Sequence, residues 1–186
     1  AVGTVGFGPL TLGSELTLVD RHVEITNPLV TGFVIGSLDR VRERRLAGFA
    51  ELAGKLGDWQ GDLGVRVENW HGRMAAPATG TAVSPMVRML AAQIGAANKP
   101  LAETTVDAVA RIWRETGTVR PRLTLARKTR VANAVERFGW LPTEASGGLA
   151  DGNIYIGNRA LRPEVAWSAE AGVDLVTPAL TLRPSL

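Results

Sequence analysis

The chain has 186 residues, a formal net charge of +3 and no cysteine. This length suits one domain, residues 1–186, and the lack of cysteine excludes disulfides, thiolate metal sites and cysteine nucleophiles. Hydrophobic residues make up 45% of the sequence and charged residues 21%, which is typical of a chain that folds. The sequence has no run of about 18 apolar residues and no apolar leader after a basic start, so we expect a soluble protein without a membrane span or signal peptide.

The first 36 residues are rich in apolar and β-branched residues and predict strands. Within them, Gly6-Phe7-Gly8 is similar to the glycine turn of a dinucleotide-binding strand. However, Asp20 follows Gly8 by only 12 residues, which is too short for the helix that such a site needs. We therefore expect no cofactor, and we expect residues 2–12 to be an ordered extended segment held by a sheet at a subunit contact.

Polar residues alternate along the next part of the predicted strand. Asp20, His22 and Glu24 would share one face, where they could form an acid/base or metal-binding cluster. The same alternation is typical of the solvated face of a half-buried strand, and a bulge or tight turn predicted at Asp20-Arg21 would break the alignment. An enzyme that uses these three residues is therefore one hypothesis, in which activity depends on pH and on His22.

Known catalytic motifs are absent from the sequence. It contains no phosphate-binding loop, nucleophile elbow or zinc-protease motif, and its two histidines exclude a histidine-rich metal site. We therefore predict no catalytic residues, no metal ligands and no enzymatic activity.

The middle of the chain, residues 37–141, predicts about four helices. Apolar residues recur there at intervals of three and four, and serine, threonine, proline and glycine mark helix ends. Strands return in residues 150–186, where Pro178 interrupts the last one. This order predicts an α+β fold, with a central helical bundle flanked by β-rich segments at residues 1–36 and 150–186. The expected helices span Ser37 to Leu56, Ser84 to Gly95, Thr104 to Gly117 and Thr124 to Phe138.

Positive charge is concentrated between residues 111 and 137, where eight basic and two acidic residues give a local charge of +6. Such a segment could neutralise the phosphates of a nucleic acid, or it could face acidic residues of a neighbouring subunit. The candidate contact residues are Arg111, Arg114, Arg120, Arg122, Arg127, Lys128, Arg130 and Arg137.

Two short stretches resemble proteins of virus particles. "DGNIYIGNRAL" with the later "AGVDLVTPALTL", within residues 151–182, resembles a β pattern of structural and accessory proteins of tailed bacteriophages. "RKTRVANAVERFGWLP" resembles the final helix of rod-shaped plant-virus coat proteins.

These resemblances imply a non-enzymatic, self-assembling structural protein, namely a capsid, coat or tail accessory component of a virion. Its expected partners are further copies of itself and other particle proteins, with possible nucleic-acid contact and no membrane contact. The expected location is the virion, assembled in the host cytoplasm, or otherwise the cytoplasm. The alternative hypothesis is a DNA- or RNA-binding protein that uses residues 111–137.

Overall fold

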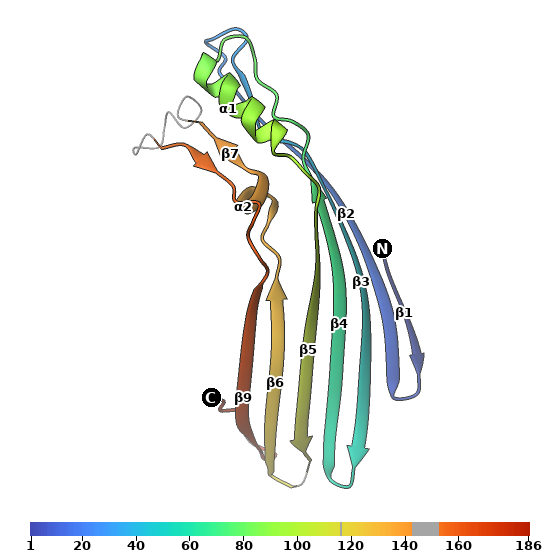
Figure 1. Ribbon diagram of the computed structural model, residues 1–186. Coiled ribbons are helices and arrows are strands. Elements are labelled where there is room, and N and C mark those ends of the chain that lie inside the picture. Colours follow the sequence, from blue (N-terminus) through green and yellow to red (C-terminus); the bar gives the residue numbers. More distant parts are fainter. Residues whose placement is uncertain (116, 143–152) are drawn as a thin grey trace.

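The computed structural model describes residues 1–115, 117–142 and 153–186, and long antiparallel strands dominate it (Figure 1). Eight strands form one sheet in the order β1-β2-β3-β4-β5-β6-β9-β10, and β7 pairs with β8 in a second sheet. The strands are β1 (Val2–Phe7), β2 (Leu10–Thr26), β3 (Val34–Leu56), β4 (Trp59–Arg73), β5 (Leu101–Arg114), β6 (Val119–Arg130), β7 (Trp140–Leu141), β8 (Tyr155–Ile156), β9 (Glu164–Val176) and β10 (Thr181–Leu182).

Short connections join the strands at one end of the large sheet, which we call the tip end (Figure 1). Gly8, Gly57 and Gly117 lie in three of these connections with φ of 60°, 61° and 57°. Glycine adopts this left-handed conformation without the steric cost that a side chain brings, which suits the tight turns of hairpins. The fourth connection, between β9 and β10, contains Pro178, so the predicted break in the last strand is confirmed.

Longer connections gather at the opposite end of the sheet and form what we call the cap, made of the described parts of residues 27–33, 74–100 and 131–163. Helix α1 (Pro85–Ala96) begins after Ser84, whose Oγ accepts a hydrogen bond from the backbone N of Val87 at 3.3 Å. Helix α2 (Ala134–Phe138) begins with a reciprocal capping box between Asn133 and Glu136. Both helices thus start with side chains that satisfy free backbone N–H groups.

The buried core lies where the cap packs against the sheet. Trp70 of β4 is fully buried, and its ring stacks on that of Phe138 with centroids 6.4 Å apart. The Nε1 of Trp140, also buried, donates to the backbone oxygen of Gly36 at 2.7 Å. Val87 and Ala91 bring one side of α1 into the same region. The cap is therefore fastened to the sheet by apolar packing supplemented with hydrogen bonds.

The expected α+β fold with a bundle of about four helices is wrong. Only the helix predicted at residues 84–95 is confirmed, as α1. The segments 37–56, 104–117 and 124–138 contribute mainly to β3, β5 and β6, with short α2 at the end of the last one. A spacing of four residues also equals two strand periods, so the apolar spacing did not distinguish these strands from helices.

The expected extended segment at residues 2–12 is confirmed as strands held by the sheet, whereas a subunit contact there stays a prediction. β1 pairs with β2 of the same chain, with Val5 opposite Leu12. The irregularity predicted at Asp20-Arg21 lies slightly later, where the register of β2 against β3 shifts between Arg21 and Val23. Of the bacteriophage-like stretch, Asp151 and Gly152 lie outside the described residues.

Gly80 in the cap offers a direct test of this packing. A Cβ at this position would lie 2.0 Å from the backbone oxygen of Gly32, and the Gly80 N–H already donates to Val34 at 2.8 Å. Gly80→Ala is therefore expected to lower the free energy of unfolding by about 1–3 kcal/mol. Gly48→Ala is the control, because a Cβ at Gly48 meets nothing within 4 Å. Equal urea midpoints for the two variants would contradict the prediction.

Candidate functional site

The register of the large sheet sorts side chains onto two faces. Directly opposed residues of antiparallel strands point to the same side, so the pairings define rows that cross the sheet. One such row crosses seven strands with apolar residues alone, and Leu125 within it is 49% exposed. We call this side the apolar face. The row consists of Phe7, Leu10, Leu52, Leu63, Ala110, Leu125 and Ala169.

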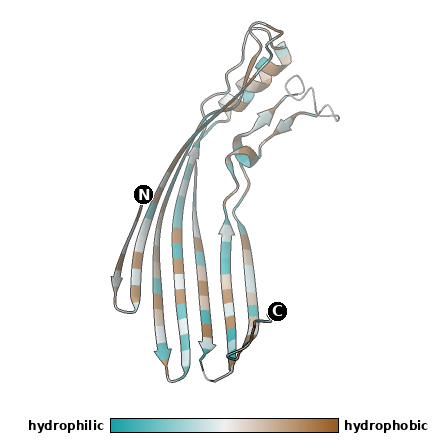
Figure 2. Ribbon diagram, turned by 180° about the vertical axis from the view of Figure 1, so that it is seen from behind, coloured by the Kyte–Doolittle hydropathy of each residue, from teal (hydrophilic) through white to brown (hydrophobic). Residues whose placement is uncertain are grey.

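Two tryptophans lie on the apolar face, one nearer the tip end of the sheet and the other nearer the cap. Trp59 lies at the tip end of β4, and Trp167 of β9 lies in the same row as Val65 of β4. Six residues separate Trp59 from Val65, a distance of about 20 Å along a strand. Arg114 lies over the ring of Trp59 at 6.0 Å, and Arg127 over that of Trp167 at 5.9 Å. Figure 2 shows the alternation of hydrophobic and hydrophilic residues along the strands.

The opposite side of the sheet, which we call the charged face, carries ion pairs between neighbouring strands. The Nε of Arg111 in β5 lies 2.7 Å from Asp62 of β4. The Nη1 of Arg122 in β6 lies 2.6 Å from Glu170 of β9, and its Nε lies 3.1 Å from Asp174. These pairs are directional charge-assisted hydrogen bonds between segments far apart in sequence.

A second group of ion pairs extends across β2, β3 and β4 on the same face. Arg66 contacts Glu15 at 3.0 Å and Glu68 at 2.9 Å, and Glu68 also lies 3.6 Å from Arg45. The charged face is therefore a polar wall in which each of these arginines faces a carboxylate. Such a wall is suited to contact with water and polar solutes, whereas the apolar face is suited to a hydrocarbon environment.

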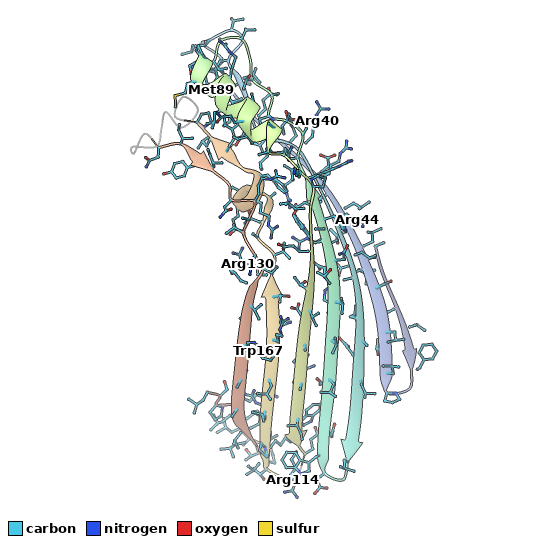
Figure 3. All side chains as sticks on the ribbon, viewed as in Figure 1. Arg40, Arg44, Met89, Arg114, Arg130 and Trp167 are labelled. Carbon is cyan, nitrogen blue, oxygen red and sulfur yellow. The ribbon has the colours of Figure 1, made fainter. Side chains whose placement is uncertain are left out.

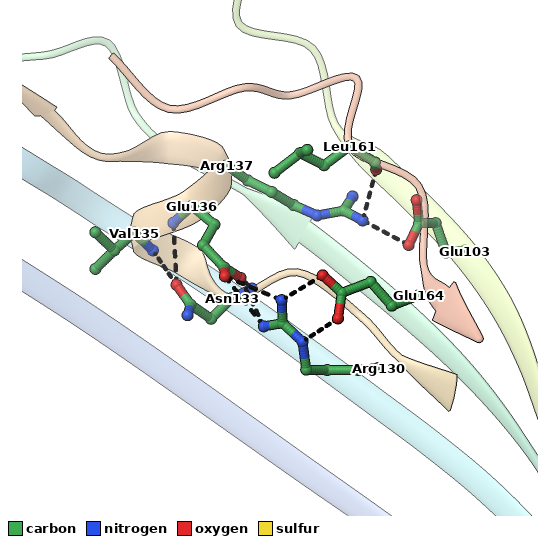
Figure 4. A network of polar contacts seen from close by, with 8 residues as sticks. All are labelled: Glu103, Arg130, Asn133, Val135, Glu136, Arg137, Leu161 and Glu164. Atoms are coloured by element: carbon green, nitrogen blue, oxygen red, sulfur yellow. Dashed lines mark hydrogen bonds and ion pairs between the residues drawn. The ribbon is translucent and has the colours of Figure 1, made fainter. Parts of the chain in front are cut away.

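The cap is attached to the charged face through a buried arginine (Figure 4). Arg137 of α2 is 1% exposed, and its Nη2 donates to Glu103 of β5 at 2.6 Å and to the backbone oxygen of Leu161 at 3.0 Å. Its guanidinium also lies 4.7 Å from the ring centroid of Trp70. A buried charge needs such partners, so Arg137 links the cap to β4 and β5.

Arg130, at the cap end of β6, joins two carboxylates in the same region (Figure 4). It contacts Glu136 of α2 at 3.0 Å and Glu164 of β9 at 2.8 Å. The hydrogen bond from Arg130, followed by that from the backbone of Asn133, holds the pKa of Glu136 below its ordinary value. The ionised form of Glu136 is thereby favoured, so this contact contributes to stability at neutral pH and is lost as the pH falls through the lowered pKa.

The eight basic residues predicted as contacts do not form one patch. Arg114 and Arg127 lie on the apolar face beside tryptophans, and Arg137 is buried under the cap. The register and ion pairs place the others on the charged face: Arg111, Arg120, Arg122, Lys128 and Arg130. Carboxylates of other strands balance much of the local charge of +6.

The structure brings together two residues of the hypothetical acid/base cluster, His22 and Glu24, whereas Asp20 pairs with an arginine. Asp20 accepts a hydrogen bond from Arg42 at 3.0 Å, whereas His22 lies 3.6 Å from Glu24 and 3.3 Å from the buried Asp39. Within residues 1–115, 117–142 and 153–186, no group of three or more histidine and acidic side chains is arranged to hold a metal ion.

The acidic partners of the arginines, including Asp62, Glu103 and Glu170, were not predicted from the sequence. The period-two alternation of "LGVRVENW" within β4 was the available signal, since it separates apolar from polar side chains in a strand.

Among the described residues, no helix has the length and apolar character needed to cross a membrane.

The chain matches the model of a known protein family. The family model described as "TonB dependent receptor-like, beta-barrel" matches residues 4–183, almost the whole chain. No curated protein matches the chain.

This match overturns the functional predictions. The family consists of bacterial outer-membrane proteins, so the resemblance to virus-particle proteins is wrong, as are the structural role in a virion and the nucleic-acid-binding alternative. The expected virion or cytoplasmic location is also wrong, and so is the expected set of partners without membrane contact. The misleading features were a short β pattern and a basic segment, both of which recur in many folds. Because the match covers nearly all of its length, the chain belongs to the TonB-dependent receptor-like β-barrel family.

Proposed function

We propose that this chain forms part of the wall of an outer-membrane receptor, with the apolar face against lipid and the charged face toward the interior. The observation that carries the proposal is the sorting of apolar and charged side chains onto opposite faces by the strand register. A transmembrane strand needs about 9–11 residues. The shortest of the six long strands, β6, has 12 residues and the longest, β3, has 23.

The height of the apolar face agrees with this role. Outer-membrane barrels present an apolar band about 25 Å tall, flanked by aromatic residues at both interfaces. Trp59 and Trp167 are separated by about 20 Å along the strands. We therefore place these two tryptophans near the two membrane interfaces, Trp59 at β4 and Trp167 at β9.

The connections support an orientation. Short turns of outer-membrane barrels lie in the periplasm, and long connections lie outside the cell. The tip end, with its hairpins at Gly8, Gly57 and Gly117, is then periplasmic, and the cap is extracellular. Because the cap packs against Trp70 on the charged face, it lies over the interior side of the wall.

The proposed location also sets a requirement on the edges of the sheet. β1 and β10 are the edge strands, and they do not pair with each other. Unpaired backbone N–H and C=O groups are costly in hydrocarbon, which is why membrane sheets close into barrels. Function as a barrel wall therefore requires further strand pairing at both edges.

In this setting we propose a non-enzymatic receptor for uptake across the outer membrane, driven by TonB as the family name implies. The charged face supplies the polar lining that a solute or a plugging segment needs, while the cap closes part of the outer mouth. The ion pairs of Arg111 and Arg122 hold adjacent strands together within that lining.

Single cysteines test the assignment of the two faces, because the natural sequence contains no cysteine. Leu125→Cys and Thr124→Cys place nitroxide labels on adjacent residues that point to the apolar and the charged face. In phospholipid vesicles, oxygen, which dissolves in hydrocarbon, should broaden the spectrum of the label at position 125 more than that of the label at position 124. A water-soluble nickel complex should broaden mainly the spectrum of the label at position 124. Equal responses at both positions would refute the proposal.

The same labelling tests the orientation. Met89 of α1 is 59% exposed, and Ala179 is exposed in the turn between β9 and β10. On intact cells, a membrane-impermeant maleimide should react with Met89→Cys, and it should react with Ala179→Cys only after the outer membrane has been permeabilised. The reverse pattern would invert the orientation.

A further inference from the structure

Three arginines and a histidine gather on the apolar face at its border toward the cap. Arg42 of β3 lies opposite Arg73 of β4, and in the next row Arg44 lies opposite His71. The three arginines are exposed and His71 is half-buried. Figure 3 shows Arg44 near the cap, far from Arg114 at the tip end. The basic group is therefore distinct from the arginine and tryptophan pair near the tips.

Like charges directly opposite each other on neighbouring strands are destabilising unless an anion balances them. The acid in these rows is Asp20, which pairs with Arg42 at 3.0 Å. Within the described part of the chain, no ion pair joins Arg44 or Arg73 to a carboxylate. The arginines of the charged face differ, since Arg66 and Arg122 each contact two carboxylates.

The nearby Glu43 does not neutralise this group. Its carboxylate accepts a hydrogen bond from Nε1 of Trp70 at 3.0 Å and pairs with Arg21, and its side chain is 2% exposed. Glu43 also belongs to the row that faces the opposite side of the sheet. The positive charge of Arg44 and Arg73 is therefore left for a partner from outside this part of the chain.

A cavity of about 530 Å³ lies at this group. Its lining includes the three arginines, Leu18 and His71, and also the acidic residues Asp20 and Glu43. The next row toward the tip end pairs Leu16 with Leu46, which is 51% exposed. Beyond it lies Gly48, where a Cβ would meet nothing within 4 Å. The cavity thus combines a cationic upper part with an apolar surface immediately below it.

We propose that this cavity binds the phosphate of an anionic lipid in the leaflet on the cap side, with the acyl chains lying over Leu16, Leu46 and Gly48. Arginine presents paired N–H donors that match phosphate oxygens, and basic residues at a membrane surface attract anionic headgroups. The inference rests on the proposed function, because it requires the apolar face to contact lipid. The inference adds a specific ligand to that function: an anionic lipid bound at the basic group on the apolar face.

The test uses a bimane fluorophore on Leu46→Cys, with the full chain reconstituted in phosphatidylcholine vesicles. Phosphatidic acid or phosphatidylcholine with a nitroxide on one acyl chain is then added, and quenching is measured against its mole fraction. Phosphatidic acid should quench this fluorophore at a lower mole fraction than phosphatidylcholine does, with a relative binding constant at least fivefold higher. The reason is that each basic residue at a membrane surface strengthens the binding of an anionic headgroup about fivefold. A bimane at Leu125→Cys, in the middle of the apolar face, should respond equally to both lipids.

Substitutions then assign the preference to the arginines. Arg44→Gln and Arg73→Gln should each reduce it about fivefold, while Arg111→Gln on the charged face should leave it unchanged. Quenching by labelled phosphatidylcholine must persist in each variant, which shows that the variant is still folded in the bilayer. A preference unaffected by Arg44→Gln and Arg73→Gln would overturn the lipid site.

Two further outcomes separate the possible failures. If labelled phosphatidylcholine fails to quench the fluorophore at position 46, the apolar face does not contact lipid and the proposed function itself fails. If both lipids quench equally, the wall assignment stands and the phosphate site alone is refuted. If inorganic phosphate in the buffer fully reverses quenching by phosphatidic acid, the site takes free phosphate and the lipid assignment is wrong.

Discussion

Replacement of Leu125 by arginine is expected to lower the stability of the chain folded in a bilayer by about 2–4 kcal/mol. Leu125 belongs to the entirely apolar row that crosses seven strands, and it is half exposed. This row contains Leu63, which lies four residues along β4 from Trp59 and two from the row of Trp167, so a lipid-facing arginine at position 125 would lie within the hydrocarbon region. The measurement is urea unfolding of the chain in phosphatidylcholine vesicles, followed by tryptophan fluorescence.

Thr124→Arg is the matched control for this prediction. Thr124 is the adjacent residue in β6, and it faces the charged side opposite Glu170 and Arg111. A new arginine there has water and a nearby carboxylate, so a change of less than about 1 kcal/mol is expected. A similar loss of stability in both variants would show that the two faces do not differ in their surroundings.

Glu103→Ala should cause the second large effect, with a loss of about 3–5 kcal/mol in the free energy of unfolding. Glu103 is the carboxylate partner of Arg137, which is 1% exposed and lies against Trp70. Removing Glu103 leaves a buried positive charge with one backbone oxygen, that of Leu161, as its remaining hydrogen-bond acceptor within the described contacts. The cap should therefore loosen from the sheet, and protease cleavage of the cap should accelerate.

Two further variants define the cause of this effect. Asp62→Ala removes the partner of Arg111, which is 56% exposed, and exposed pairs are worth at most about 1 kcal/mol. The double variant Glu103→Ala/Arg137→Met removes the buried charge together with its partner, so it should recover much of the stability lost in Glu103→Ala. If the double variant is as unstable as Glu103→Ala, packing rather than the uncompensated charge is responsible.

The one helix predicted correctly, α1, depends on local signals. Ser84 caps its first turn, Pro85 occupies the first helical position, and Gly95 lies next to its final residue. Each of these residues acts on backbone groups within a few positions of itself, so no knowledge of the remaining chain is needed.

The apolar spacing in and just after the helix predicted from Ser37 to Leu56 shows why local spacing failed elsewhere. Leu52 and Leu56 are four residues apart, which is two periods of β3, and Trp59 and Leu63 are likewise two periods apart in β4. The turn at Gly57 explains the intervening spacing of three, since a hairpin shifts the alternation between strands. All four side chains therefore share the apolar face of a hairpin, while imitating one side of a helix.

The function could not be predicted from the sequence, because the arrangement of the charged side chains also depends on how the strands pair. The basic segment at residues 111–137 was read as one charged surface, but its members lie on both faces of the sheet and under the cap. Their partners are distant in the chain: Arg111 pairs with Asp62, 49 residues away, and Arg122 with Glu170, 48 residues away. Charge balance of this kind exists only after the strands have paired.

The sequence by itself determined local features: the glycine turns, the capped helix α1, the extended N-terminal segment and the alternation along individual strands. Only the tertiary structure decided which alternating residues share a face, because a row consists of residues from different strands and its membership depends on register. A shift of one residue would exchange the two faces of a strand. The apolar face, the charged face and the basic cavity at Arg44 and Arg73 are therefore properties of the paired sheet, to which each strand contributes only a few side chains.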